Sequence, residues 1–194
     1  FPPDVISGVN IYQANIPAKY GGRIASVVDI KVKSPYTDKF KLEGGVGVIS
    51  SRLSLSTPII KDKLMLLAGG RIGFTDFLFP LLIPRLKNTK ANFKDSTVKL
   101  LYLPNENNQL TYTHFFSQDF YQLDLISSIE NIVSSSNQYD FGTSNHTLRW
   151  LHSFDNETNL VGTFVHSNYL PQNLFPEIES TNVIRFESQI QYTS

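Results

Sequence analysis

From Lys39 onward, apolar and polar residues alternate, and short polar turns separate pairs of alternating segments. Residues 61–63, 104–108 and 155–158 have the composition of tight turns, whereas the intervening connections are long and irregular. A period of two residues predicts strands with two different faces, and a tight turn predicts that the strands on either side of it are antiparallel. We therefore predict an all-β chain folded as an antiparallel meander.

The alternation predicts about eight strands in this part of the chain. In residues 64–75, one face is apolar throughout, and the other becomes polar only after its first half, which is typical of a wall whose inner surface is partly covered. Residues 50 and 51 would form one further short turn. We expect the eight strands at residues 39–49, 52–60, 64–75, 96–103, 109–123, 143–154, 159–170 and 183–192.

Tight turns at one rim and long loops at the other are typical of outer-membrane barrels, whose spanning strands need only about 9–11 residues. No stretch of roughly 18 apolar residues occurs, which excludes a transmembrane helix. Aromatic residues near the strand ends would form interface girdles, or would reflect the ordinary preference of aromatics for strands. These residues are Phe74, Phe77, Tyr102, Phe120, Tyr121, Trp150, Phe154, Tyr169 and Tyr192.

Two further alternating segments, residues 9–14 and 24–33, precede the meander and are joined by a turn. Gly21 and Gly22 permit a positive φ or a close backbone approach there, and the guanidinium of Arg23 could bind a carboxylate. On local grounds, any β-hairpin of a soluble domain would have the same pattern.

Residues 6–34 resemble the end of the plug domain in TonB-dependent outer-membrane transporters. In that family, a small-residue turn leads into a strand that ends in Lys, and the first barrel strand follows. The matching residues are Tyr20, Gly21, Gly22, Arg23, Val28, Asp29, Ile30 and Lys33, although many members have Asn where Asp29 stands.

The resemblance implies a division of the chain into two parts. Residues 1–36 would be the C-terminal end of the plug, and residues 37–194 would be the first strands of a transmembrane barrel of about 22 strands with a plugged lumen. The TonB box, the earlier part of the plug and most of the barrel would then lie outside this chain. Because the chain opens on Phe1 rather than Met, we expect it to be a fragment of a longer precursor.

The function implied by the resemblance is energised uptake of a small nutrient ligand through the cell outer membrane. A periplasmic energy-coupling protein, acting through the missing N-terminal part, would pull the plug. The segment 77–84 would contact the ligand or a surface lipoprotein, or would fold back on its own apolar residues. The gate would contain Tyr20, Gly21, Gly22, Arg23 and Asp29, and the polar residues that face the lumen and contact plug or water would be Arg71, Lys99, Arg149 and Arg185.

The sequence offers no catalytic, cofactor or metal site. His114, His146, His152 and His166 lack the spacing of a metal signature, and the absence of cysteine removes thiolate chemistry. The formal net charge is zero, so no electrostatic case exists for nucleic acid. The alternative to a transporter is a soluble or small closed β-barrel or sandwich that serves as a binding or adhesion module without transport, because eight strands can close by themselves.

Overall fold

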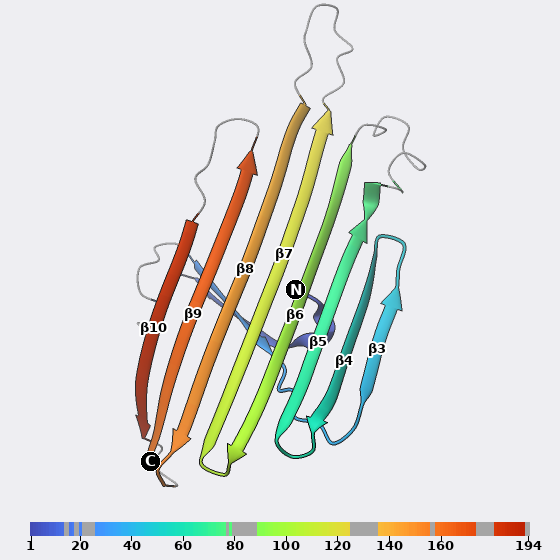
Figure 1. The fold of residues 1–194 in the computed structure, drawn as a ribbon. Coiled ribbons are helices and arrows are strands. Elements are labelled where there is room, and N and C mark those ends of the chain that lie inside the picture. Colours follow the sequence, from blue (N-terminus) through green and yellow to red (C-terminus); the bar gives the residue numbers. More distant parts are fainter. Residues whose placement is uncertain are drawn as a thin grey trace, which may run out of the picture.

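The computed structural model describes residues 1–13, 16–17, 20, 26–76, 78, 89–124, 136–155, 158–173 and 181–192, with only the backbone described at 123–124, 136–137, 172–173 and 181–192. Eight strands form one antiparallel sheet in which each strand lies beside its neighbours in sequence (Figure 1). The strands are β3 (Lys41–Val46), β4 (Ser50–Ile60), β5 (Leu64–Phe74), β6 (Lys90–Asn105), β7 (Asn108–Asp124), β8 (Ser136–Ser153), β9 (Thr158–Asn173) and β10 (Thr181–Tyr192). The predicted all-β antiparallel meander is therefore confirmed.

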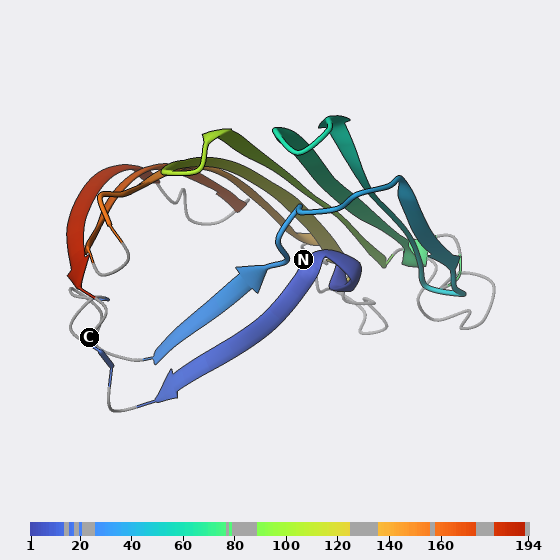
Figure 2. The ribbon, with the colours of Figure 1, turned by 90° about the horizontal axis from the view of Figure 1, so that it is seen from below.

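The first part of the chain forms a separate hairpin. A short 3-10 helix, η1 (Pro3–Val5), leads into β1 (Ile6–Gln13), which pairs with β2 (Ser26–Val32) in a two-stranded sheet. The eight-stranded sheet is strongly curved, and the hairpin lies on its concave side (Figure 2). The two alternating segments that precede the meander thus pair with each other rather than with the large sheet.

The large sheet is open along both edges within the described part of the chain. β3 pairs only with β4, and β10 pairs only with β9. A barrel is therefore not closed by these eight strands. Among the described residues, no helix is long and apolar enough to cross a membrane.

Short turns join the strands at one end of the sheet, and hydrogen bonds from backbone and side-chain groups stabilise these turns. In the turn after β4, Asp62 has a φ of 57° and the amide of Lys63 donates to the carbonyl of Ile60 at 3.0 Å. In the turn after β8, the amide of Thr158 donates to Asp155 Oδ1 at 2.6 Å. Asp tolerates left-handed backbone and caps turns with its carboxylate, so the composition of residues 61–63 predicts a tight turn correctly.

Several strand boundaries differ from the sequence-based expectation, and the largest differences are at the starts of β6 and β8. β6 begins at Lys90 and β8 at Ser136, because both extend along β7, which supplies backbone partners as far as Asp124. Most residues of these extensions are polar, and their apolar members are Ala91, Phe93, Tyr139 and Phe141, so hydrophobic alternation marks the extensions only weakly. Ser50 and Ser51 belong to β4 rather than to a turn. The amide of Gly47 donates to the carbonyl of Ser50 at 2.9 Å, so the turn between β3 and β4 lies before Ser50.

Cross-strand pairing divides the side chains of the sheet between a concave and a convex face. The concave row that runs from Ser54 through Gly69 to Thr97 faces the hairpin, because a Cβ added at Gly69 would lie 2.5 Å from Val5 Cγ1. The buried apolar residues of the sheet share this face by register. They are Met65, Leu67, Leu101 and Val161.

Candidate functional site

The concave face, where it meets the hairpin, is the first candidate site. Lys99 on β6 reaches across and donates to the backbone carbonyl of Val32 at the end of β2, with an N···O distance of 3.1 Å. Near the start of the chain, Arg52 Nε lies 3.1 Å from Asp4 Oδ2. The hairpin is thus held to the wall by a few polar contacts together with the close packing of Val5 against Gly69.

An ion pair lies within the wall, on the same face. Arg71 on β5 donates from Nε at 3.0 Å and from Nη2 at 2.6 Å to one oxygen, Oδ2 of Asp95 on β6. The carbon at the centre of the same guanidinium lies 4.6 Å from the ring centre of Phe93. The Asp95 side chain is only 5% exposed, and its Oδ1 has no hydrogen-bond partner among the described groups. Because the Asp95 carboxylate is buried, loss of the Arg71 cation would be costly, and the pair is sensitive to substitution.

The four polar residues predicted to face the lumen share the concave face in register. Arg71 and Lys99 contact Asp95 and Val32 as described above. Arg149 pairs with Thr111 and so has the same orientation as Lys99. The backbone of Arg185 pairs with Val165, which places it at an equivalent register position, and its side chain lies outside the described part of the structure.

The predicted gate is described only in part. Tyr20 donates its amide to the carbonyl of Pro17 at 2.9 Å, and its ring centre lies 5.5 Å from that of Tyr12. Asp29 lies on β2 opposite Asn10. Gly21, Gly22 and Arg23 lie outside the described residues, as does the segment 77–84 except for Leu78. The gate therefore remains a prediction.

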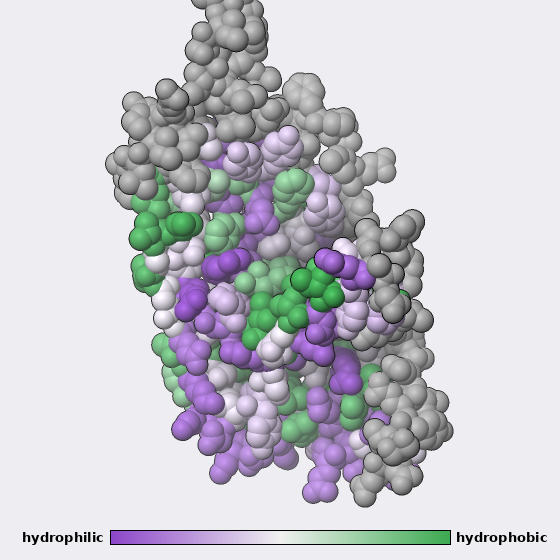
Figure 3. All heavy atoms as spheres, turned by 180° about the vertical axis from the view of Figure 1, so that it is seen from behind, coloured by the Kyte–Doolittle hydropathy of each residue, from purple (hydrophilic) through white to green (hydrophobic). Residues whose placement is uncertain are grey.

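The convex face is the second candidate site, and it is apolar. Leu53 and Ile72 are 55% and 56% exposed there, and a groove of about 610 Å³ runs over the small residues Ala68 and Gly70. Apolar residues whose register positions share this face include Leu42, Leu53, Leu55, Leu64, Leu66, Ile72, Val98, Leu100, Leu110, Leu148, Phe164 and Leu170. The concave side is mostly hydrophilic, with a small hydrophobic cluster over the hairpin (Figure 3).

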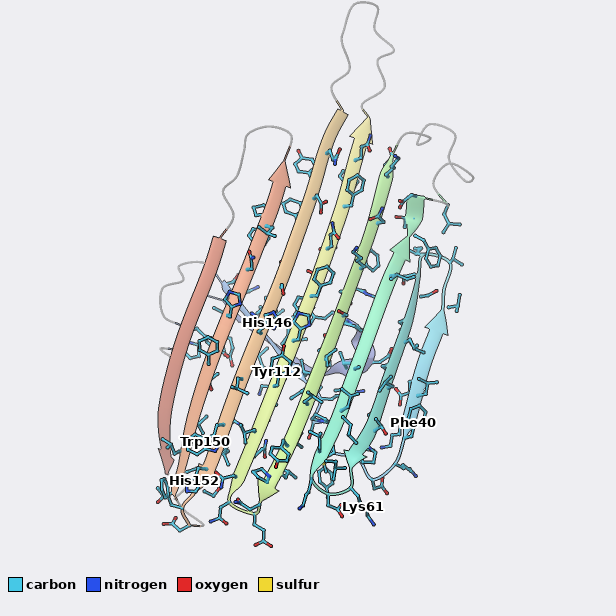
Figure 4. All side chains as sticks on the ribbon, viewed as in Figure 1. Phe40, Lys61, Tyr112, His146, Trp150 and His152 are labelled. Carbon is cyan, nitrogen blue, oxygen red and sulfur yellow. The ribbon has the colours of Figure 1, made fainter. Side chains whose placement is uncertain are left out.

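Aromatic side chains gather on the convex face at the end of the sheet with the short turns. Trp150 and His152 lie there on β8, at the same end of the sheet as the labelled Lys61 but several strands away from it (Figure 4). Trp150 Nε1 donates to Asn108 Oδ1 at 3.0 Å, and the ring of His152 meets that of Phe154 edge to face at 4.6 Å. These residues would form one girdle of a membrane protein.

Two of the residues predicted to form an outward-facing girdle lie instead on the concave face. Tyr121 pairs with Ala91 and Tyr139, and Tyr169 pairs with Thr143, positions that belong to the concave face by register. Neighbouring residues of a strand point to opposite faces, so Phe120 and Tyr121 cannot both face outward. Phe77 and the side chain of Tyr192 lie outside the described residues.

The convex face also contains a row of three histidines that sequence reasoning missed. His114 lies opposite His146, and His146 lies opposite His166, on three adjacent strands. The short turn after β8 could have indicated the second pairing, whereas the long connection between β7 and β8 leaves the first undetermined. No group of three or more His, Asp or Glu side chains within the described residues is arranged to hold a metal ion.

Comparison of this chain with family models, with curated proteins and with solved structures gave no match.

Proposed function

We propose that this chain is a segment of an outer-membrane transporter for energised uptake of a small nutrient ligand, comprising the end of its plug and the first eight strands of its barrel wall. The observation that carries the proposal is the distribution of polarity between the two faces. The apolar face of the sheet is convex and exposed, and the polar face is concave and partly covered by the hairpin.

This distribution differs from that expected for a soluble sheet with one covered face, because charged residues lie on the covered face and apolar residues are exposed on the other. In water, the face that a hairpin covers should be the apolar one, because burial of apolar area drives packing. Here the covered face contains the charged residues Arg52, Arg71, Asp95 and Lys99 beside the buried Met65, Leu67 and Leu101, whereas Leu53 on the other face is more than half exposed. Lipid covers an apolar convex face in membrane barrels, whose interior is polar.

The dimensions of the strands agree with this proposal. Strands β6 to β9 contain 16, 17, 18 and 16 residues, more than the roughly 9–11 that a tilted spanning strand needs. Such strands would cross the bilayer and extend beyond it at the end with the long connections. The aromatic cluster around Trp150 would lie at the opposite interface.

The hairpin fits the role of a displaceable plug segment. Its polar contacts with the wall include the Lys99–Val32 hydrogen bond and the Arg52–Asp4 ion pair, which are few enough to break together. It also exposes an apolar surface of its own, with Ile11 opposite Val28, and that surface suits packing against the remainder of a plug. The periplasmic energy-coupling protein and a surface lipoprotein would be the protein partners in this scheme.

The test uses Trp150, the only tryptophan in the chain. The chain is inserted into phosphatidylcholine vesicles whose acyl chains carry bromine, which quenches tryptophan emission on contact. We expect strong quenching of Trp150. In a Trp150→Phe background, Leu148→Trp on the convex face should also be quenched, whereas Thr147→Trp on the concave face should be protected.

Thr147→Trp is the matched control, because residues 147 and 148 are adjacent on β8 and differ only in the face to which they point. Equal quenching at the two positions would contradict the assignment of faces. The rival soluble module predicts a chain that stays monomeric in water without detergent and shows no quenching in vesicles, and that result would overturn the proposal.

A further inference from the structure

The apolar groove on the convex face has a floor of small residues and larger apolar walls. The floor follows β5 over Ala68 and Gly70, and the groove has a volume of about 610 Å³. Leu53 on β4 lines one side, and Phe116 on β7 lines the other. A groove of this kind can hold one extended hydrocarbon chain, because its walls offer dispersion contacts that a flat face lacks.

A lysine lies at one end of this groove. Lys94 on β6 lines the groove and pairs with Ile72, and its ammonium nitrogen lies 6.0 Å from the ring centre of Phe116. A second hollow, of about 700 Å³, continues from there toward the end of the sheet with the long connections, and both Lys94 and Lys90 line it. The convex side of β6 therefore changes from apolar to cationic along the groove.

The position of the two lysines along β6 matches one surface of a bilayer. Tyr102, on the same strand, lies in the same cross-strand row as Trp150 at the end of the sheet with the short turns. A spanning strand needs roughly 9–11 residues, and that length counted from Tyr102 reaches residues 93 to 91. Lys94 thus lies just before the opposite bilayer surface and Lys90 just beyond it, at the level of lipid phosphate groups.

The two ammonium groups are available to bind an anion. Both lysines are exposed, and neither forms an ion pair within the part of the chain that the structure describes. Two carboxylates at this end of the face have amide partners instead. Asn92 Nδ2 donates to Asp76 Oδ2 at 2.7 Å, and Gln118 Nε2 donates to Asp140 Oδ1 at 3.1 Å. The lysines lie four residues apart on one face, about 13 Å along the strand, so their long side chains can converge on one phosphate.

We propose that the groove and the two lysines form a binding site for an anionic phospholipid, with one acyl chain in the groove and the phosphate between Lys90 and Lys94. The inference rests on the proposed function, which places the convex face in lipid, and it adds a preferred lipid at one defined place. Lysines near a membrane surface attract anionic lipids, and hydrogen bonds between ammonium and phosphate groups are charge-assisted.

The experiment places a tryptophan in the wall of the groove. In a Trp150→Phe background, Phe116→Trp keeps an aromatic ring beside Lys94, and the full chain is held in micelles of a neutral detergent. Phosphatidylglycerol or phosphatidylcholine, each with brominated acyl chains, is then titrated into separate samples. We expect phosphatidylglycerol to quench the tryptophan at a concentration at least about fivefold lower, because each lysine near a surface contributes about fivefold to the binding of anionic lipid.

Two kinds of variant test the two parts of the site. Lys90→Gln and Lys94→Gln should each weaken phosphatidylglycerol binding about fivefold, and the double variant should lose the preference over phosphatidylcholine. Gly70→Val should weaken phosphatidylglycerol binding by filling the groove. An added Cβ at Gly70 would lie 3.6 Å from the carbonyl oxygen of Asp95, which is an ordinary contact, so the sheet can accept this substitution.

The double variant Lys61→Gln with Lys63→Gln is the matched control. It removes the same charge from two exposed lysines in the turn between β4 and β5, at the opposite end of the sheet. This control should keep the preference for phosphatidylglycerol. If it lost the preference as fully as Lys90→Gln with Lys94→Gln, the attraction would be general and the site would not exist.

The remaining outcomes separate this inference from the proposed function. Equal quenching by the two lipids would overturn the specific site while the convex face stayed in contact with lipid. No quenching by either lipid would overturn the proposed function as well. Glycerol phosphate carries the phosphate without acyl chains and should not displace phosphatidylglycerol; displacement at equal concentration would indicate a site for free phosphate and overturn the assignment to a lipid.

Discussion

At the residue scale, the Arg71–Asp95 pair shows how the polar concave face is stabilised. Asp95 is buried, and the guanidinium of Arg71 donates twice to one of its oxygens. The Phe93 ring lies against the cation, and the backbone nitrogen of Phe1 lies 3.5 Å from the same carboxylate oxygen. Removal of one partner would leave a desolvated charge, which costs more than the net contribution of the intact pair.

We therefore expect Arg71→Met to lower the free energy of unfolding by about 2–3 kcal/mol, because the Asp95 carboxylate would lose its cation. The measurement is the midpoint of urea-induced unfolding in detergent micelles.

Arg52→Met is the matched control for this prediction. Arg52 is the direct cross-strand partner of Arg71 on β4 and forms its own ion pair with Asp4, but its side chain is 46% exposed. An exposed pair contributes less than about 1 kcal/mol, so this variant should unfold near the original midpoint. Equal losses from the two variants would show that burial of Asp95 does not determine the cost.

At the scale of elements, the position of the hairpin depends on close contact between η1 and β5. Val5 is fully buried, and Gly69 is the residue against which it packs. Any larger side chain at Gly69 would occupy the position of the valine methyl group. The hairpin and the large sheet are otherwise separate sheets, so this contact can be weakened without removing a strand from either.

Gly69→Val should detach the hairpin from the wall while the large sheet stays paired. The added side chain would overlap Val5, which has no exposed surface toward which it could move. We expect amide hydrogen exchange in residues 6–32 to accelerate and exchange in β6 and β7 to stay slow. Gly162→Val is the control, because no atom lies within 4 Å of an added Cβ there, and its exchange pattern should be unchanged. Slow exchange in the hairpin of Gly69→Val would refute the role of this contact.

A second prediction at this scale concerns the turn before β2, and it depends on the sequence resemblance. Arg23→Gln should loosen that turn, because the guanidinium would no longer be available to bind a carboxylate. Protease sensitivity within residues 14–25 should rise while insertion of the sheet into vesicles stays normal. A variant that failed to insert at all would show that the turn and the wall do not have separate roles.

At the scale of the whole molecule, the large sheet separates two environments. The convex face exposes many apolar side chains, and the concave face contains charged side chains and is occupied by a hairpin, so a charge should be tolerated very differently at adjacent positions. We expect Phe164→Lys on the convex face to reduce the free energy of insertion into vesicles by roughly 2 kcal/mol. Thr163→Lys on the concave face should have a much smaller effect. Equal penalties would contradict the contact between the convex face and lipid.

The open edges of the sheet give a further prediction at this scale. β3 and β10 each leave one row of backbone groups without a strand partner among the described residues. Exposed edges promote pairing between chains. The chain should therefore form large assemblies in water and smaller ones in detergent, as measured by size-exclusion chromatography with light scattering. A stable monomer in water would favour the soluble alternative.

Much of the fold could be predicted from the sequence because it depends on local signals. The period of two residues, together with Asp and Asn in the short turns, determines the number of strands, their antiparallel order and the division of side chains between two faces. The polarity of those faces follows as well, since residues 64–74 already alternate between apolar and mixed positions. Strand extensions such as Lys90 to Asp95, in which only Ala91 and Phe93 are apolar, carry little of this signal, and pairing with β7 reveals them.

Tertiary structure alone determined which residues meet across the long connections and what lies over each face. Arg71 and Asp95 are 24 residues apart, and His114 and His146 are 32 apart in number, with a long connection inside each interval. A long connection does not specify register, and a shift of two residues would separate both pairs while keeping the same faces. The placement of the hairpin on the concave side likewise depends on contacts such as Val5 with Gly69, which no periodic pattern encodes.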